Sequence, residues 1–148
     1  MRSPDGPAGS PERRKILVID GEQSVIELLA DLFESEGYAV TTSNEVQDAV
    51  QSIGEAEPDL FILDPWIDGV ARWELLDRVK DDPDTAQIPS IVYSAEVAEL
   101  DRRHARLSAR GYVTLPKPFD LDALDDMVER LIGPRRSVSG EGPASRAV

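Results

Sequence analysis

The chain of 148 residues contains no cysteine, a single histidine, and no apolar run of transmembrane length. Without cysteine it has no disulfides, thiolate nucleophiles or cysteine-bound zinc, which excludes a secreted disulfide scaffold and thiol redox chemistry. The first fourteen residues lack an apolar core, so they do not form a signal peptide. The length suits one compact domain. We expect a cytoplasmic location and no association with membranes.

Basic residues are scarce in the first half of the chain. The net charge is -13, and the span between Lys15 and Arg72 holds thirteen acidic residues but no basic one. Nucleic-acid binding depends on clustered lysine and arginine, so we expect no nucleic-acid partner. The acidic half should attract divalent cations and basic protein surfaces. Solvated helix faces explain most of these carboxylates equally well.

Composition and hydrophobic periodicity set the organisation of the chain. Proline, glycine and serine dominate both ends, which predicts disordered tails at 1–13 and 134–148 around one domain at 14–133. Within this domain, apolar runs alternate five times with helical patterns, which implies a parallel sheet covered on both faces. The predicted strands are 16–19, 38–42, 59–63, 90–93 and 112–115, and the predicted helical stripes are 25–33, 45–54, 73–79, 97–107 and 121–131.

Four polar residues stand at or just past the ends of predicted strands: Asp20, Asp64, Ser94 and Lys117. The carboxyl ends of parallel strands lie along one edge of the sheet, where open α/β sheets bind ligands. Two carboxylates, a hydroxyl and an ammonium group should therefore converge. Each residue alone is explained as a turn former, a helix cap or a solvated turn residue. The four together favour a functional site.

These segments resemble the receiver domains of two-component response regulators over about residues 15–132. The matching motifs are KILVIDGEQSVIELLADLFESEGYAV, PDLFILD, IPSIVYSA and LPKPFDLDAL. The resemblance implies a flavodoxin-like, doubly wound sheet of five parallel strands in the order 2-1-3-4-5, with five helices. It also implies that Asp64 is the phosphoacceptor, Asp20 the first acid of the acidic pair, Ser94 the switch hydroxyl and Lys117 the pocket lysine.

The chemistry of such a site is simple. A carboxylate can accept a phosphoryl group covalently once the negative charge of that group is neutralised. The resemblance implies a magnesium ion held by Asp20, Asp64 and the backbone carbonyl of Trp66, with Lys117 paired to the acyl phosphate. Ser94 would bond a phosphoryl oxygen, and this new contact would move the loop after the fourth strand.

The chain departs from the family at the metal site. Gly21 stands where the family has its second acid, which is a direct metal ligand, so we expect weakened magnesium binding. Glu22 and Asp68 are candidate replacements, although an acid at the start of a helix is also favoured by the helix dipole. Magnesium needs only one or two protein carboxylates, so binding can survive the loss.

Two positions suggest altered chemistry or signalling. Trp66, two residues after Asp64, either shields the acyl phosphate from water or packs against its own loop. Thr114 replaces the aromatic residue that the family couples to the switch hydroxyl Ser94, so signal transmission should change. His104 lies on the apolar stripe of the fourth predicted helix, where packing is the expected role.

The fourth predicted helix carries the densest basic cluster of the chain, in a region that belongs to the partner-binding surface of the family. Three of its arginines lie four residues apart on one face. An acidic partner would explain them, but so would solvation and an ordinary intrahelical pair between Glu99 and Arg103. The three candidate binding residues are Arg102, Arg106 and Arg110.

The sequence therefore predicts a stand-alone receiver of a phosphorelay, without enzyme activity of its own. It would accept a phosphoryl group on Asp64 from a histidine kinase or phosphotransfer protein and then bind a separate downstream protein, as a monomer or weak dimer. The alternative is a pseudo-receiver that binds partners without phosphorylation, because Gly21 replaces a metal-binding acid. A hydrolase with an aspartyl nucleophile fits less well, since Trp66 occupies the place of its usual second acid.

Overall fold

The computed structural model describes residues 13–44, 49–67 and 69–133. The predicted tails, apart from Arg13, lie outside the described residues, and so does the candidate ligand Asp68. Within the described ranges, no helix is long and apolar enough to span a membrane.

Five parallel strands form the central sheet, in the order β2-β1-β3-β6-β7. This order is 2-1-3-4-5 when the five strands are counted along the chain, which confirms the predicted flavodoxin-like fold. The inner strands are almost entirely apolar because both faces of a doubly wound sheet are covered. The strands are β1 (Lys15–Ile19), β2 (Ala39–Ser43), β3 (Leu60–Leu63), β6 (Ser90–Ser94) and β7 (Tyr112–Pro116).

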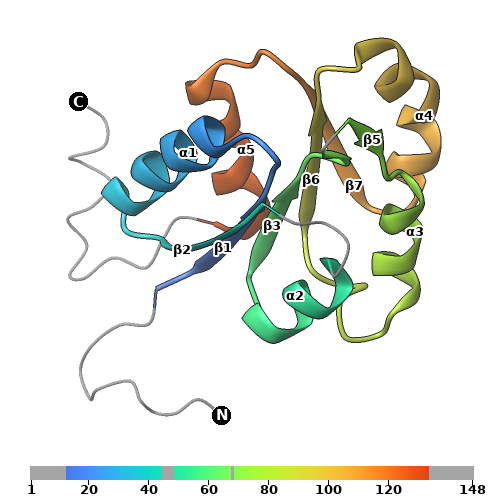
Figure 1. Ribbon diagram of the computed structural model, residues 1–148. Helices are drawn as coiled ribbons and strands as arrows, with labels where there is room; N and C mark the ends of the chain where they lie inside the picture. Colours follow the sequence, from blue (N-terminus) through green and yellow to red (C-terminus); the bar gives the residue numbers. More distant parts are fainter. Residues whose placement is uncertain (1–12, 45–48, 68, 134–148) are drawn as a thin grey trace.

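The helices cover the sheet in two layers (Figure 1). One face carries α1 (Gln23–Ser35) and α5 (Leu121–Ile132), and the other carries α2 (Ala49–Ala56), α3 (Glu74–Asp81) and α4 (Val97–Ala109). Successive side chains of a strand point to opposite faces of the sheet, so the apolar residues of each strand are divided between the two helix layers. In β1, Leu17 and Ile19 pack with α2, α3 and α4, whereas Ile16 and Val18 pack with α1 and α5.

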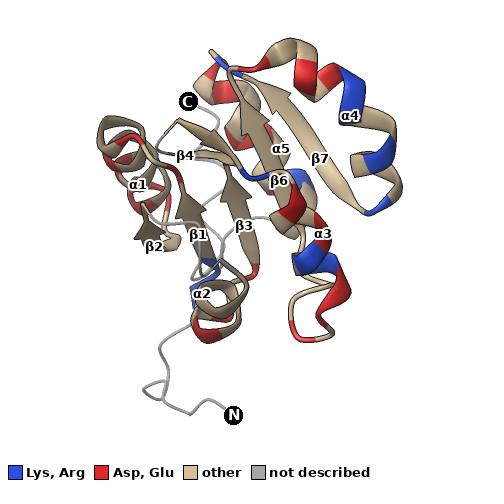
Figure 2. Ribbon diagram, turned by 45° about the vertical axis from the view of Figure 1, so that its right-hand side comes forward, with Lys and Arg blue, Asp and Glu red and all other residues tan. Residues whose placement is uncertain are grey.

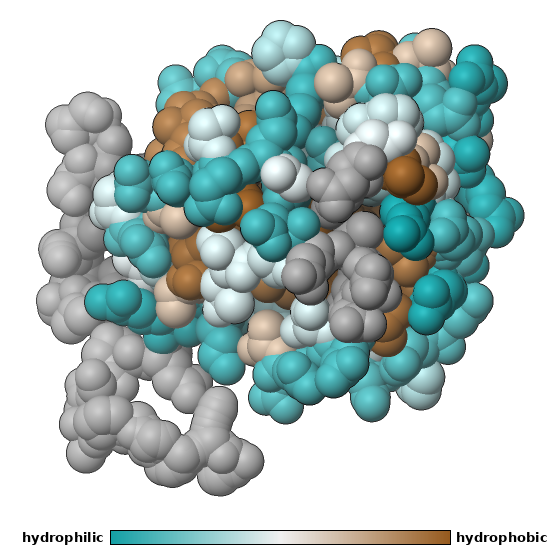
Figure 3. Space-filling model, viewed as in Figure 1, coloured by the Kyte–Doolittle hydropathy of each residue, from teal (hydrophilic) through white to brown (hydrophobic). Residues whose placement is uncertain are grey.

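The helices follow most of the predicted apolar stripes, but Leu28, Val97 and His104 are exposed. Asp120 caps α5, because its side chain accepts a hydrogen bond from the Asp122 backbone N–H at 3.1 Å. Leu28 and Val97, which the sequence placed on apolar stripes, are 49% and 43% exposed. A stripe drawn from spacing alone is therefore too wide at these two positions. Figure 3 shows hydrophilic residues over most of the face it presents, with smaller hydrophobic patches between them.

A short antiparallel hairpin follows Asp64. It consists of β4 (Trp66–Ile67) and β5 (Val70–Ala71), and its turn passes through Gly69 at φ 74°. A hydrogen bond of 2.8 Å from the Arg72 N–H to the Pro65 carbonyl closes its base. The sequence did not predict this hairpin, because strands of two residues leave no alternating pattern. The hairpin begins two residues after Asp64, at the carboxyl end of β3.

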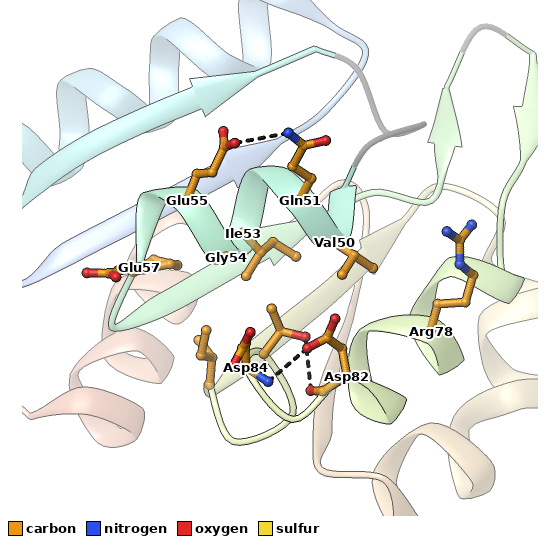
Figure 4. A pocket seen from close by; sticks show the side chains of 12 residues that line it. Val50, Gln51, Ile53, Gly54, Glu55, Glu57, Arg78, Asp82 and Asp84 are labelled. Atoms are coloured by element: carbon orange, nitrogen blue, oxygen red, sulfur yellow. Dashed lines mark hydrogen bonds between the residues drawn. The ribbon is translucent and has the colours of Figure 1, made fainter.

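A groove of about 880 Å³ lies at the opposite end of the sheet from Asp64. Its lining includes Pro58 and Ile88, which come just before β3 and β6 and so mark the amino ends of those strands. Figure 4 shows Ile53 of α2 directed toward the loop that follows α3 and carries Asp82 and Asp84. The groove is therefore no part of the predicted phosphorylation site.

Gly54 lies inside α2 at the wall of this groove, and its replacement by alanine should stabilise the protein. A Cβ atom at this position meets nothing within 4 Å, so no contact requires glycine. Alanine loses less conformational entropy than glycine in a helix, so we expect Gly54→Ala to raise the free energy of unfolding by about 0.5–1 kcal/mol in urea titrations. Gly111→Ala is the matched control and should lower it, because Gly111 has φ 92°. A destabilised Gly54→Ala variant would contradict this explanation.

Candidate functional site

Three of the four predicted site residues meet at the carboxyl edge of the sheet. Asp20 follows β1, Asp64 follows β3 and Lys117 follows β7. Backbone hydrogen bonds extend the sheet to these positions, from the Asp64 N–H to the Ile19 carbonyl at 3.0 Å and from the Lys117 N–H to the Ser94 carbonyl at 2.9 Å. The peptide bond between Lys117 and Pro118 is cis. The parallel topology therefore brings together residues that are far apart in the sequence.

Lys117 bridges the two carboxylates. Its Nζ atom donates to Asp64 Oδ2 at 2.9 Å and to Asp20 Oδ2 at 3.0 Å, and Glu22 Oε1 lies 3.4 Å away. The side chains of Asp20 and Asp64 are only 1% and 7% exposed, so these ion pairs are largely removed from water. Buried charges are tolerated only when they are paired and hydrogen-bonded, and here a single ammonium serves both acids.

Burial raises the pKa of the Asp64 carboxyl above its ordinary value. Hydrogen bonds from the Trp66 backbone N–H and from Lys117 oppose this shift without cancelling it. For Lys117, burial acts to lower the pKa, but the hydrogen bonds and charges of Asp64 and Asp20 outweigh it and the pKa is raised. A carboxylate with a raised pKa is more basic than a solvated one, which suits a nucleophile, and the ammonium beside it keeps its charge.

Tyr93 is a part of this site that sequence reasoning missed. Its hydroxyl donates to Asp20 Oδ2 at 2.8 Å, and its buried ring lies under the Lys117 ammonium, 4.6 Å from Nζ to the ring centroid. Burial and the neighbouring Asp20 charge raise the pKa of Tyr93, so the phenol stays a neutral donor. The one signal available in the sequence was that a buried tyrosine needs a hydrogen-bond partner.

Ser94 and Thr114 bond to α4 and to the residue that precedes it. Ser94 is fully buried at the end of β6, and its Oγ accepts a hydrogen bond from the Glu96 N–H at 3.0 Å. Thr114 Oγ1 lies 3.0 Å from His104 Nδ1. The expectation that His104 packs into the core is wrong, because this side chain is exposed at the edge of α4, where it reaches β7. The switch roles of Ser94 and Thr114 remain predictions.

A cavity of about 340 Å³ opens over the cluster. Its lining includes Asp20, Gly21, Glu22, Asp64 and Trp66. The Trp66 side chain is 42% exposed, so it forms part of the cavity wall without closing it.

The donor set in this cavity is small but suits magnesium. Among the described residues, no group of three or more histidine, cysteine or acidic side chains is arranged to hold a metal ion. Magnesium, however, prefers hard oxygen donors, keeps several waters and needs only one or two protein carboxylates. Asp20 and Asp64 provide these, and Glu22 lies at the rim. Their three negative charges exceed the single positive charge of Lys117, which favours a cation in the cavity.

Figure 2 shows basic positions along α4 and acidic positions on α3. The arginines of the basic cluster are engaged in ion pairs. Arg106 and Arg110 both contact Asp77 of α3, at 2.9 and 3.0 Å, and Arg110 also contacts Asp81 at 2.8 Å. Arg102 pairs with Glu99, as Arg103 does. The sequence predicted the Glu99–Arg103 pair but not the contacts between α3 and α4. The predicted partner-binding role of Arg102, Arg106 and Arg110 is not tested by this geometry.

These contacts predict a pH-dependent contribution of Asp77 to stability. The hydrogen bond from Arg106 holds the pKa of Asp77 below its ordinary value of 3.8. The resulting stabilisation is therefore present above pH 3.8 and lost as the pH falls through the lowered pKa. Because Asp77 is 39% exposed, we expect Asp77→Asn to cost at most about 1 kcal/mol near neutral pH, and less at high salt. Urea titrations at neutral pH and below pH 3 measure the difference in the free energy of unfolding between the wild-type protein and Asp77→Asn. This difference should shrink in acid. A cost that persists in acid would contradict the ion-pair explanation.

Comparison with known proteins agrees with this geometry. The model of the response regulator receiver domain family matches residues 16–129. The chain is 34% identical over 119 residues to the phosphate regulon transcriptional regulatory protein PhoB of Rhizobium meliloti, an alignment that covers 80% of this chain and 52% of PhoB. The chain spans between about a quarter and about a half of the length of the curated relatives it matches.

Solved structures show the same fold. A response regulator from Chloroflexus aurantiacus, described as putative, is 26% identical, with a TM-score of 0.70 over 82% of this chain and 98% of its own. The receiver domain of a sensor histidine kinase from Pseudomonas aeruginosa is 20% identical, with a TM-score of 0.69 over 82% of this chain and 99% of its own. That structure has a magnesium ion coordinated in its active-site cleft.

Proposed function

Since the chain belongs to the response regulator receiver domain family of two-component systems, we propose that Asp64 accepts a phosphoryl group and that the phosphorylated protein signals by binding another protein. The observation that carries this proposal is the arrangement of Lys117 between two buried carboxylates at the carboxyl edge of the sheet. An oxygen of Asp64 would attack the phosphorus of the donor, and the bond from phosphorus to the donor would break as the aspartyl bond forms. The chain needs no further enzyme activity for this role.

Lys117 would supply charge stabilisation in this reaction. The phosphoryl group carries negative charge on its equatorial oxygens throughout the transfer. Lys117 Nζ, now 2.9 Å from Asp64 Oδ2, is placed to pair with the new acyl phosphate. Receiver domains typically bind magnesium, and here Asp20, Asp64 and the Trp66 carbonyl would hold the ion, with Glu22 at the rim. When bound, magnesium neutralises charge on the phosphoryl oxygens.

Ser94 is the proposed switch. Its hydroxyl lies at the end of β6 and already accepts the Glu96 N–H just before α4. A phosphoryl group on Asp64 offers new acceptor oxygens to this hydroxyl, and the resulting contact would draw in the segment before α4. Thr114 and His104 connect β7 to α4 and would respond to that shift. The proposed partners are a histidine kinase or phosphotransfer protein as donor and a separate protein as target.

Incubation with acetyl phosphate tests the proposal. Intact mass spectrometry should show the gain of one phosphoryl group in the presence of magnesium and far less after chelation with EDTA. Treatment with hydroxylamine, which cleaves acyl phosphates, should remove the added mass. No gain under any condition would refute the proposed function.

Gly21 supports one alternative. Because the second acid of the family is missing, the domain could bind partners without being phosphorylated. In that case the wild-type protein would gain no mass with acetyl phosphate, whereas a Gly21→Asp variant would gain one phosphoryl group. That pair of results would favour the pseudo-receiver.

A further inference from the structure

Tyr93 contacts both charged groups that flank Asp64. Its hydroxyl donates to Asp20 Oδ2 at 2.8 Å, and Lys117 Nζ lies 4.6 Å from its ring centroid. The side chain is 0% exposed, and its ring stacks on Phe119 with centroids 5.3 Å apart and planes at 14°. Core packing therefore fixes the ring, and the fixed ring places both the hydroxyl and the surface that faces Lys117.

Asp20 depends on donors of this kind because it is almost completely buried. Its Oδ1 atom accepts the Glu22 N–H at 2.9 Å, and Oδ2 accepts both Tyr93 and Lys117. The two oxygens are held on separate sides, so the plane of the carboxylate is set. Tyr93 is the neutral side-chain donor among these contacts. It adds a hydrogen bond to Asp20 without adding a positive charge that would oppose a metal ion.

We propose that Tyr93 is a positioning residue for phosphoryl transfer, an inference that rests on the proposed function of Asp64. Its hydroxyl fixes Asp20 in the orientation that the magnesium site requires, and its ring holds the Lys117 ammonium beside Asp64. Magnesium tolerates little departure from octahedral geometry, so the orientation of each ligand matters. With Gly21 in place of the second acid, the site has fewer carboxylates to fix the ion, and the orientation of Asp20 matters more.

Tyr112 provides a matched control on the neighbouring strand. It is 3% exposed, its hydroxyl donates to the Leu76 carbonyl at 2.7 Å, and Lys80 Nζ lies 4.7 Å from its ring centroid. Tyr112 thus has the same burial, one hydroxyl hydrogen bond and one lysine over its ring, but it packs on the α2, α3 and α4 side of the sheet. Loss of its hydroxyl should disturb the core without touching Asp20.

Magnesium titration separates the two tyrosines. Fluorescence can follow binding because Trp66 lines the cavity. We expect Tyr93→Phe to weaken magnesium binding about tenfold, as is typical when a hydrogen-bond partner of a metal ligand is lost. Tyr112→Phe should leave magnesium affinity unchanged. It should lower the melting temperature about as much as Tyr93→Phe does, because each variant loses one buried hydroxyl hydrogen bond.

Lysine NMR tests the ring contact without metal or phosphoryl group. The chain has three lysines, so labelling with 13C at Cε gives three signals, and Lys117→Arg identifies one of them. We expect Tyr93→Leu to move the Lys117 signal, because the ring current is lost, and to leave Lys80 in place. Tyr112→Leu should do the reverse.

Each half of the proposal has its own contradicting result. Equal magnesium affinity of Tyr93→Phe and the wild-type protein, or equal weakening in Tyr112→Phe, would overturn the role of the hydroxyl. A wild-type protein that binds no magnesium would overturn it as well. An unmoved Lys117 signal in Tyr93→Leu would overturn the role of the ring. None of these measurements requires phosphorylation, so a failure of acetyl phosphate labelling refutes the proposed function separately.

Discussion

Replacing Asp64 by alanine should abolish the magnesium-dependent gain of one phosphoryl group from acetyl phosphate. The variant keeps the rest of the site but loses the proposed nucleophile. Among the residues that the structure describes, Asp20 and Asp64 are the two buried carboxylates that accept a hydrogen bond from Lys117. Asp20 is the nearest competitor, but its two oxygens together accept three hydrogen bonds, whereas those of Asp64 accept two. Intact mass before and after hydroxylamine treatment measures the loss.

The Asp64→Ala variant must also be shown to fold. Removing a buried carboxylate that is paired to Lys117 leaves that ammonium with Asp20 and Glu22 as partners, so the fold should persist. Far-UV circular dichroism and urea titration check this point. A folded Asp64→Ala variant that still gains a hydroxylamine-sensitive phosphoryl group would place the acceptor elsewhere and contradict the assignment.

Replacing Gly21 by aspartate should strengthen magnesium binding by at least about tenfold, since a carboxylate would return to a position next to Asp20. The backbone permits the change, because Gly21 is exposed and is not among the described residues with positive φ. Acetyl phosphate labelling of Gly21→Asp should then reach its maximum at lower magnesium concentrations than in the wild-type protein. Calorimetric titration with magnesium measures the affinity directly.

Gly21→Asn is the control for this prediction. It has nearly the shape of aspartate but no charge, so it should gain much less affinity. Glu22→Gln, introduced into the wild-type protein, shows whether Glu22 replaces the missing acid: a loss of affinity would identify it as a ligand. Equal magnesium affinity in Gly21→Asp and the wild-type protein would contradict the account of a weakened metal site.

The sequence was sufficient to predict the strands of the sheet and to predict which residues lie together at its carboxyl edge. The apolar run from Ile16 to Ile19 predicts a strand that is buried on both faces, because no polar residue interrupts it. The structure has β1 at this position. Parallel pairing of the strands then places Asp20, Asp64 and Lys117 at one edge of the sheet, whatever conformation the loops adopt. These predictions succeed because they depend on topology, which the pattern of strands and helices largely determines.

Other features depend on contacts that no local pattern contains. The strand pattern IVYS predicts only that Tyr93 packs in the core. Its three-dimensional surroundings are needed to show that its hydroxyl reaches Asp20. The partners of Arg110 lie about thirty residues earlier in α3, so spacing within one helix could not find them. His104 fits the helical stripe but lies at its edge, where β7 offers Thr114 in place of core packing.

The most direct test of phosphorylation on Asp64 identifies the phosphorylated residue. After incubation with acetyl phosphate and magnesium, borohydride reduction converts an aspartyl phosphate to homoserine, and tandem mass spectrometry of the peptides locates the converted residue. We expect homoserine at position 64 and unchanged aspartate at position 20. Homoserine at any other position, or none in a protein that has gained phosphoryl mass, would contradict this assignment.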